Sequence, residues 1–194
     1  MYTKISTFSD IILGYNFRSA IEEDITGNVS IIQAKNIVQD HPITHLDGLP
    51  RVSLINTRTS AILQKKDILI VSRGTGIGSF RATIFDIEKK NAIASWSILI
   101  VRVKKPEIIP EYLCLYLNSE DGQKKILETI SWATIHTISP KKFSEIGIPI
   151  IPLIKQKNMV WLHQNIIQQE KIYNRKKELK QEILTATLKN IIHS

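Results

Sequence analysis

The stretch Ile146-Gly-Ile-Pro-Ile-Ile-Pro-Leu153 decides the fold, because it separates two parts of the chain with different periodicities. Pro149 and Pro152 exclude a helix interior, so the stretch predicts an edge strand that runs into a rigid linker. From Lys155 to about Asn190 there is no Gly or Pro, and apolar residues recur at three- and four-residue intervals. We therefore predict one amphipathic helix of roughly 35 residues, which is about 50 Å long.

This stretch divides the chain into a domain of residues 1–153 and a helical part of residues 154–194. Residues 111–117 and 123–130 carry apolar side chains at helical spacing and predict a short helical pair. Up to about residue 110, short β-branched runs bounded by turn residues are typical of strands. These runs are residues 29–32, 52–55, 67–72 and 97–103. The expected fold class is α+β, a mostly β domain with short helices followed by one long C-terminal α-helix.

The charge of the chain favours a polyanionic partner. The 26 Lys and Arg residues outnumber the 18 Asp and Glu residues, which gives a net charge of +8 at pH 7. Such a surplus favours nucleic acid over a membrane surface. The surplus is uneven, because residues 155–190 carry a net charge of +5 and the rest of the chain carries +3. Net charge alone therefore supports DNA reading by the β domain only weakly.

Cysteine content and hydropathy indicate an intracellular chain. Cys114 is the only cysteine, so neither an internal disulfide nor a cysteine zinc cluster can form. The longest uncharged apolar run, residues 92–101, is about half the length that spans a bilayer. The first residues lack the apolar core of a secretory signal. We expect the protein to be cytoplasmic.

The stretch Ser72-Arg-Gly-Thr-Gly-Ile-Gly-Ser79 is the most conspicuous local motif. Its glycines are not spaced as in a dinucleotide-binding turn, and the residues after it favour a strand over the helix that such a site needs. A glycine hairpin that carries Arg73 and Arg81 toward solvent is better supported, with a plain structural turn as the alternative.

A metal-dependent nuclease would need two carboxylates and a lysine close together. Asp67, Glu88 and Lys90 match that pattern loosely, although a solvated charge cluster explains them better. The five histidines show no paired ligand spacing, and no Ser or Cys lies in a nucleophile elbow. We expect no catalytic residue, no cofactor and no metal ion.

Several motifs in order resemble the target-recognition domains of DNA specificity (S) subunits of type I restriction-modification systems. The resemblance covers nearly the whole chain, and the order and spacing of the motifs make it fairly specific. The motifs are Gly14-Tyr-Asn-Phe-Arg-Ser19, Ser72-Arg-Gly74, Ala92-Ile-Ala-Ser95, Ile109 to Ser119, Thr134 to Ser139, Ile148 to Leu153, and Gln156 at the start of the long helix. The family's usual Pro-His pair is displaced here to Ile135-His136-Thr137, and residues 151–155 lack an acidic residue common before the glutamine.

The resemblance implies a non-catalytic subunit that reads DNA. Subunits of this family carry two target-recognition domains joined by two helices, and this chain shows one of each. It thus resembles a half-size subunit, which would dimerise through its long helix and read a bipartite palindromic site. Methylation would belong to a methyltransferase partner, and cleavage, if any, to a restriction nuclease subunit. The candidates for the dimer or partner seam are Leu162, Ile166, Tyr173, Leu179 and Ile183, with Gln169 and Lys176 interrupting it.

The candidate DNA contacts are polar, basic or aromatic residues at turns, where side chains can project into a groove. They are Gln33, Lys35, Asn36, Arg51, Arg58, Arg73, Arg81 and Trp96. Trp96 fits the core equally well, Arg58 fits an internal salt bridge, and Lys35 with Asn36 fits a solvated turn. The sequence leaves open an assembly or decoy protein that binds methyltransferase subunits through the helix, and, less well supported, the metal-dependent nuclease.

Overall fold

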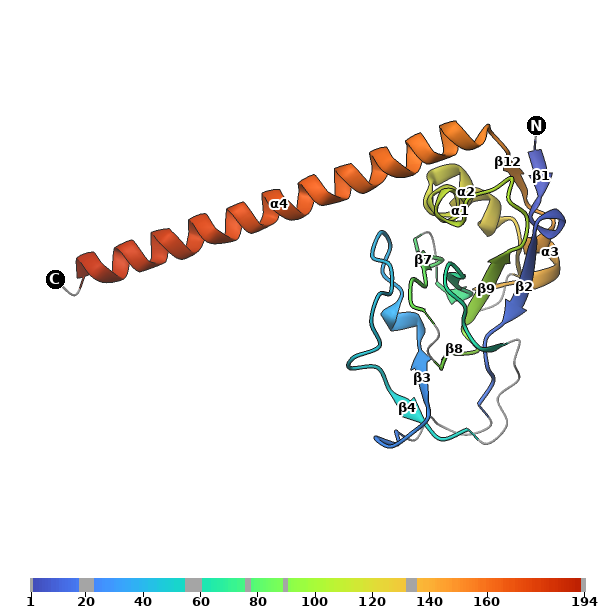
Figure 1. Ribbon diagram of the computed structural model, residues 1–194, viewed down its shortest axis with the longest axis horizontal. Coiled ribbons are helices and arrows are strands. Elements are labelled where there is room, and N and C mark those ends of the chain that lie inside the picture. The colour runs from blue at the N-terminus through green and yellow to red at the C-terminus, as the bar shows by residue number, and fades with distance from the viewer. Residues whose placement is uncertain are drawn as a thin grey trace. The chain divides into compact units, whose positions relative to one another are not determined.

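The computed structural model describes residues 2–17, 23–54, 61–75, 78–88, 91–131 and 136–192. The chain forms two compact units, residues 1–156 and residues 157–194, which we describe separately. Strands and short helices build the first unit, and the second consists of most of the single long helix α4 (Figure 1). The expected fold class, a mostly β domain followed by one long C-terminal helix, is confirmed.

The largest sheet of the first unit has four strands in the order β2-β9-β5-β7, and all its neighbouring strands are antiparallel. The strands are β2 (Ser9–Leu13), β9 (Ile98–Val103), β5 (Ile68–Val71) and β7 (Ala82–Ile84). Every residue of β5 is buried, which explains its continuous apolar run. The strands predicted at 67–72 and 97–103 are confirmed to within one residue at each end.

In the described part of the chain, three smaller sheets complete the β structure. In the second sheet, β3 (Val29–Ile32) lies between β4 (Arg51–Val52), which is antiparallel to it, and β8 (Ala92–Ala94), which is parallel. The third sheet has the order β10 (Ile130–Ser131), β11 (His136–Ile138) and β6 (Arg73–Gly74). The predicted edge strand is β12 (Gly147–Pro149), whose one strand partner among the described residues is β1 (Tyr2–Lys4).

Gly14 allows the end of β2 to approach the turn after β8. A Cβ atom on Gly14 would lie 2.0 Å from the carbonyl oxygen of Ser95. The backbone N–H groups of Gly14 and Tyr15 donate to Ile98 O at 3.0 Å and to Ala94 O at 2.7 Å. Only glycine fits at this position, which gives a physical reason for the first motif of the sequence.

The predicted helical pair is α1 (Pro110–Asn118) and α2 (Glu120–Leu127), which lie next to each other. Ser119 caps α2 by accepting a hydrogen bond from the Gly122 N–H at 3.2 Å. The side-chain amide of Asn118 bonds both the N–H and the carbonyl of Ala82, each at 2.9 Å. It thereby covers part of the free edge of β7. Shorter helices are η1 (Ile5–Thr7), η2 (Ala34–Asn36) and α3 (Pro140–Ser144).

Helix α4 (Leu153–Ile192) has 40 residues, somewhat more than the sequence predicted. Gln156, in its first turn, is fully buried. Its side-chain oxygen accepts a hydrogen bond from the Ile109 N–H at 2.9 Å, and its side-chain nitrogen donates to Glu107 O and Ile151 O, each at 2.8 Å. These bonds fix the start of α4 to the first unit. Within the residues that the structure describes, no helix is long and apolar enough to cross a membrane.

Candidate nucleic-acid interface

Backbone hydrogen bonds bring the ends of several strands together at one place in the first unit. The Ser95 N–H donates to Ile32 O at 2.8 Å, which joins the β8–β9 turn to the end of β3. The Ser72 N–H donates to Ser97 O at 2.8 Å, which joins the same turn to the end of β5. Trp96 lies at the tip of this turn, next to the residues that follow β3 and β5. The candidate interface therefore combines segments that are far apart in the sequence.

Arg73 and Trp96, both predicted DNA contacts, form a stacked pair. The guanidinium carbon of Arg73 lies 3.7 Å from the centre of a Trp96 ring, a cation–π contact. Arg73 is exposed, and Trp96 is 44% exposed. Trp96 is therefore a surface residue, and the alternative that it belongs to the core is wrong.

Arg81 is half-buried, and its Nε donates to Ile37 O at 3.1 Å. The predicted hairpin exists as the antiparallel pair β5–β7, but β6 within it pairs with β11. Of the two arginines that we expected to face solvent, Arg81 therefore has a structural contact, because its hydrogen bond joins the hairpin to the segment after η2. A role of Arg81 in DNA contact remains a prediction.

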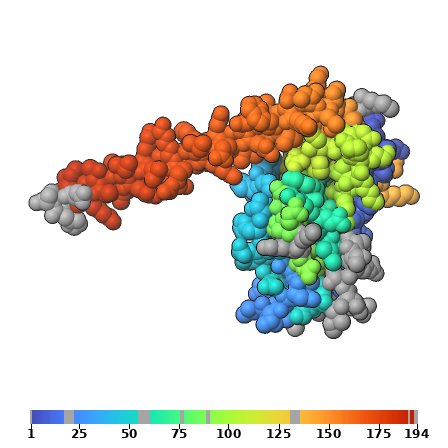
Figure 2. Space-filling model, in the orientation of Figure 1, coloured from blue at the N-terminus to red at the C-terminus, as the bar shows by residue number. Residues whose placement is uncertain are grey.

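Lys35 and Asn36 belong to the 3₁₀ turn η2 that follows β3, and Gln33 is its N-cap residue. The side-chain oxygen of Asn36 accepts a hydrogen bond from the Gln33 N–H at 2.9 Å, so this oxygen stabilises the turn. Lys35 is exposed, whereas Gln33 and Asn36 are half-buried. In the view of Figure 2, the blue-to-cyan segment that contains η2 forms one side of the first unit.

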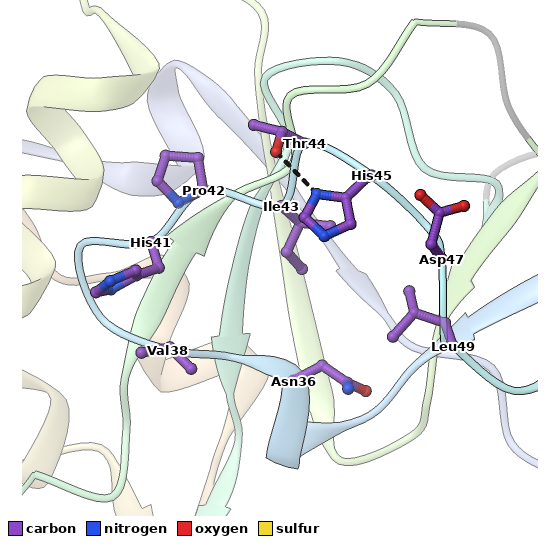
Figure 3. Close-up of a pocket in the computed structure, with 9 residues that line it drawn as sticks. All are labelled: Asn36, Val38, His41, Pro42, Ile43, Thr44, His45, Asp47 and Leu49. Carbon is purple, nitrogen blue, oxygen red and sulfur yellow. Dashed lines mark hydrogen bonds between the residues drawn. The ribbon is translucent and has the colours of Figure 1, made fainter. Parts of the chain in front are cut away.

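The segment after η2 curves around a shallow hollow of about 200 Å³ (Figure 3). Hydrogen bonds to β7 and its extension hold the segment, including Thr83 Oγ1 to His41 O at 2.7 Å and Ile43 N to Ile84 O at 2.8 Å. His41 and His45 lie on different sides of Ile43 in Figure 3. The lining residues are Asn36, Val38, His41, Pro42, Ile43, Thr44, His45, Asp47 and Leu49.

Arg51 is exposed on the edge strand β4, and Arg58 lies outside the described residues. Beside Arg51, the Asp24 carboxylate accepts hydrogen bonds from Ser53 Oγ at 2.6 Å and from the Thr26 hydroxyl at 2.6 Å and N–H at 2.9 Å. The bond from Ser53, followed by those from Thr26, lowers the pKa of Asp24. Asp24 orders the turn next to β4, a contribution that the sequence analysis missed.

The nuclease alternative lacks the carboxylate it needs. Asp67 is buried, and Arg102 donates to both of its oxygens, from Nε at 2.9 Å and from Nη2 at 2.7 Å. The hydrogen bond to Asp67 is the largest influence on the Arg102 pKa and raises it. Lys90 lies outside the described residues. In the described part of the chain, no three His, Cys, Asp or Glu residues are grouped so that they could hold a metal ion.

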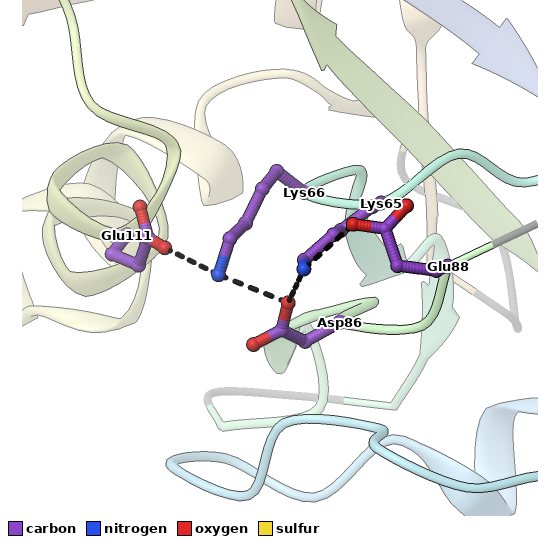
Figure 4. A network of polar contacts seen from close by, with 5 residues as sticks. All are labelled: Lys65, Lys66, Asp86, Glu88 and Glu111. Carbon is purple, nitrogen blue, oxygen red and sulfur yellow. Dashed lines mark hydrogen bonds and ion pairs between the residues drawn. The ribbon is translucent and has the colours of Figure 1, made fainter.

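Glu88 belongs instead to a partly exposed network of alternating charges (Figure 4). Lys65 pairs with Glu88 at 2.9 Å, and Lys66 lies between Asp86 at 3.0 Å and Glu111 at 2.9 Å. Burial alone would lower the pKa of Lys66, but its hydrogen bonds to Glu111 and Asp86 outweigh burial and raise it. The network joins the turn before β5 to the first turn of α1, which is a structural role.

The five predicted seam residues of α4 are all exposed in the chain. At 100° per residue they fall on two stripes, with Leu162, Ile166 and Tyr173 on one and Leu179 with Ile183 on the other. Two exposed residues that the sequence analysis missed, Trp161 and Ile172, belong to the second stripe. A sequence pattern that could have revealed them is an 11-residue repeat. It relates Trp161, Ile172 and Ile183 to one another, and also Leu162, Tyr173 and Leu184. Gln169 and Lys176 lie between the stripes.

No family model matches the sequence, and no curated protein matches it. Solved structures match it by fold. A chain from a structure of the assembly and conformational transition of a type I restriction-modification system has a TM-score of 0.67 at 19% identity, covering 91% of this chain and 40% of that one. The HsdS subunit from Thermoanaerobacter tengcongensis has a TM-score of 0.63 at 19% identity, over 91% of this chain and 39% of its own. The type I S subunit from M. genitalium has a TM-score of 0.52 at 16% identity, over 82% and 37%.

The fold is therefore that of a type I restriction-modification S subunit. The present chain spans about two fifths of the length of these proteins and corresponds in fold to that share of the HsdS subunit. The family resemblance drawn from the ordered sequence motifs is matched by the three-dimensional structure.

Proposed function

We propose that this protein is a sequence-specific DNA-recognition subunit of a type I restriction-modification complex. The observation that carries the proposal is the fold match over 91% of the chain at a TM-score of 0.67. The position of the Arg73–Trp96 pair supports the proposal, because backbone hydrogen bonds join its turn to the end of β3, just before η2. Cationic, amide and aromatic groups of the kinds that contact DNA are thus carried by neighbouring segments. We place the protein in the cytoplasm, where it meets DNA.

The chemical step belongs, in this proposal, to partner subunits. The carboxylate of Asp67, which a metal-dependent nuclease would need, is bound to Arg102. The remaining basic and amide groups on the surface suit binding to phosphates and base edges. A methyltransferase subunit would supply methylation, and a restriction nuclease subunit could join the same complex.

Helix α4 is the proposed assembly element. Its 40 residues correspond to about 60 Å at 1.5 Å per residue, longer than the roughly 34 Å of one turn of B-DNA. A homodimer paired through this helix could therefore place two reading domains on two half-sites, and its two-fold symmetry would require a palindromic bipartite sequence. The exposed apolar residues of α4 lie on two stripes. In this proposal, one stripe binds a second copy of the chain and the other binds a methyltransferase subunit.

Methylation of a random DNA pool tests the function. The full chain, purified together with its methyltransferase partner, should direct methylation to one bipartite palindromic sequence. Methyltransferase alone is the control and should show no such preference. Methylation by the complex without sequence preference would contradict DNA recognition. If the chain still bound the methyltransferase, that result would favour the alternative of an assembly or decoy protein, which needs only the exposed apolar surface of α4.

A further inference from the structure

Arg73 differs from the other arginines of the described chain in how its side chain is held. Arg81 donates to Ile37 O, Arg102 pairs with Asp67, Arg175 pairs with Glu178, and Arg51 is exposed on β4. In the described part of the chain, the Arg73 side chain makes no hydrogen bond or ion pair, yet it is held against Trp96 at 3.7 Å. The structure thus positions this guanidinium while leaving its hydrogen-bonding capacity unused.

Stacking uses the face of the guanidinium and leaves its edge available. The N–H groups of arginine lie in the plane of the guanidinium, and the central carbon of the Arg73 guanidinium lies over the Trp96 ring, 3.7 Å from the ring centre. An arginine held in this way presents a planar pair of donors. That donor pair matches the two acceptors, O6 and N7, which guanine displays in the major groove.

The backbones that carry the two side chains are joined to each other. The Ser72 N–H, next to Arg73, donates to the carbonyl of Ser97, next to Trp96, at 2.8 Å. On its other side, Arg73 is paired with Thr137 of β11. The residue after Arg73 is also constrained, because a Cβ on Gly74 would lie 2.2 Å from the Cβ of Ser79. Arg73 therefore projects from a fixed sheet position and not from a free loop.

We propose that Arg73 reads a guanine in the recognised DNA and that Trp96 is the positioning residue that orients its guanidinium. The inference rests on the proposed function and adds to it the base that is read and the two residues that read it. A phosphate contact needs only a nearby positive charge, whereas bidentate base reading needs a fixed orientation of the donors. Preorganisation by Trp96 lowers the conformational entropy lost on binding, and this favours base reading.

Selection from a random DNA pool by the full chain with its methyltransferase partner, followed by sequencing, tests the inference. We expect wild type to select a guanine at a position that Arg73→Lys no longer selects. Discrimination there should fall roughly 5- to 150-fold, because lysine keeps the charge and loses the planar donor pair. The other positions of the motif should be unchanged. Arg175→Lys is the matched control, since Arg175 is also exposed, pairs with Glu178 on α4 and is not a candidate DNA contact, and it should keep the guanine preference.

Trp96 variants test the positioning role. Trp96→Phe retains an aromatic face and should keep most of the guanine preference, whereas Trp96→Ala should lower discrimination at the same position and at no other. Unfolding temperatures equal to that of wild type would show that the variants are folded, as the exposure of both residues predicts.

The outcomes separate the inference from the proposed function. Absence of any sequence preference in wild type would overturn both. A wild-type motif that Arg73→Lys leaves unchanged would overturn the guanine assignment alone. Uniform weakening of binding to every sequence by Arg73→Ala, with the salt dependence reduced by about one phosphate contact, would show a phosphate role and overturn it as well.

Discussion

At the scale of single residues, the ion pair of Asp67 with Arg102 is the contact whose loss should destabilise the first unit most. Asp67→Ala leaves the partly buried Arg102 without its carboxylate, and breaking a buried pair in this way costs about 3–5 kcal/mol. Urea unfolding monitored by circular dichroism measures the change. Glu88→Ala, which removes an exposed partner of Lys65, should cost less than about 1 kcal/mol. Equal effects of the two substitutions would contradict a structural role specific to Asp67.

Cys114 should be chemically inert in the folded protein. Cys114 is buried within α1, and burial raises the pKa of its thiol. A thiol-specific chromogenic disulfide at pH 8 should react with it only after denaturant is added. Rapid reaction in the native state would show that α1 opens locally.

Burial of the same thiol predicts a loss of stability at alkaline pH. The pKa of the Cys114 thiol is higher in the folded state than the value of about 8.5 in the unfolded state. The folded state therefore keeps its full stability below about pH 8.5 and loses stability as the pH rises above it, because the thiol ionises more readily in the unfolded chain. Between about pH 8.5 and 9.5 the unfolding free energy should fall by up to roughly 1.4 kcal/mol per pH unit. Cys114→Ala should remove this slope. Tyr116, whose pKa burial raises to about 12, and Lys66 act only at higher pH.

At the scale of elements, periodicity was enough to predict strands, the helical pair and the long helix, because these patterns are local. The partners of individual polar side chains were not predictable. Asp67 appeared in the sequence as a candidate metal ligand, and its partner Arg102 is 35 residues away, beside it only because β5 pairs with β9. The short strands β6 and β11 also carry too few residues to show a period of two. The sequence predicted Arg73 and Trp96 as separate DNA contacts. Their contact with each other was not predictable, because it depends on pairing between segments far apart in the sequence.

The start of α4 should depend on one side chain. Gln156 makes three hydrogen bonds with backbone groups of Ile109, Glu107 and Ile151, so Gln156→Ala leaves those groups unpaired and should cost roughly 2–4 kcal/mol. Gln168→Ala, an exposed glutamine on the same helix, should change stability by less than about 0.5 kcal/mol. Thermal unfolding of both variants measures the difference. A small effect of Gln156→Ala would mean that this residue does not hold the first turn of α4 in place.

At the scale of the whole molecule, the uneven charge and the exposed helix belong together. The helical part carries +5 of the net +8, and its apolar residues form two stripes with Gln169 and Lys176 between them. A single seam would bury one stripe and leave the other in water. Two stripes of exposed apolar residues are better explained by two different protein surfaces, with Lys176 between them close to the DNA phosphates or to acidic partner side chains. Assembly, in this interpretation, is the larger part of what α4 does.

Substitutions on each stripe can separate the two proposed contacts. Wild type should sediment as a dimer at tens of micromolar. Replacing Leu162 and Tyr173 by Glu places charge on one stripe, and replacing Trp161 and Ile172 by Glu places it on the other, while Asn174→Glu, which is exposed and lies off both stripes, serves as the charge control. One double variant should become monomeric yet still bind the methyltransferase, and the other should dimerise and lose the methyltransferase, because each stripe is buried by a different partner. A monomeric wild type, alone and with methyltransferase, would contradict helix pairing, and loss of both contacts in both variants would contradict separate stripes.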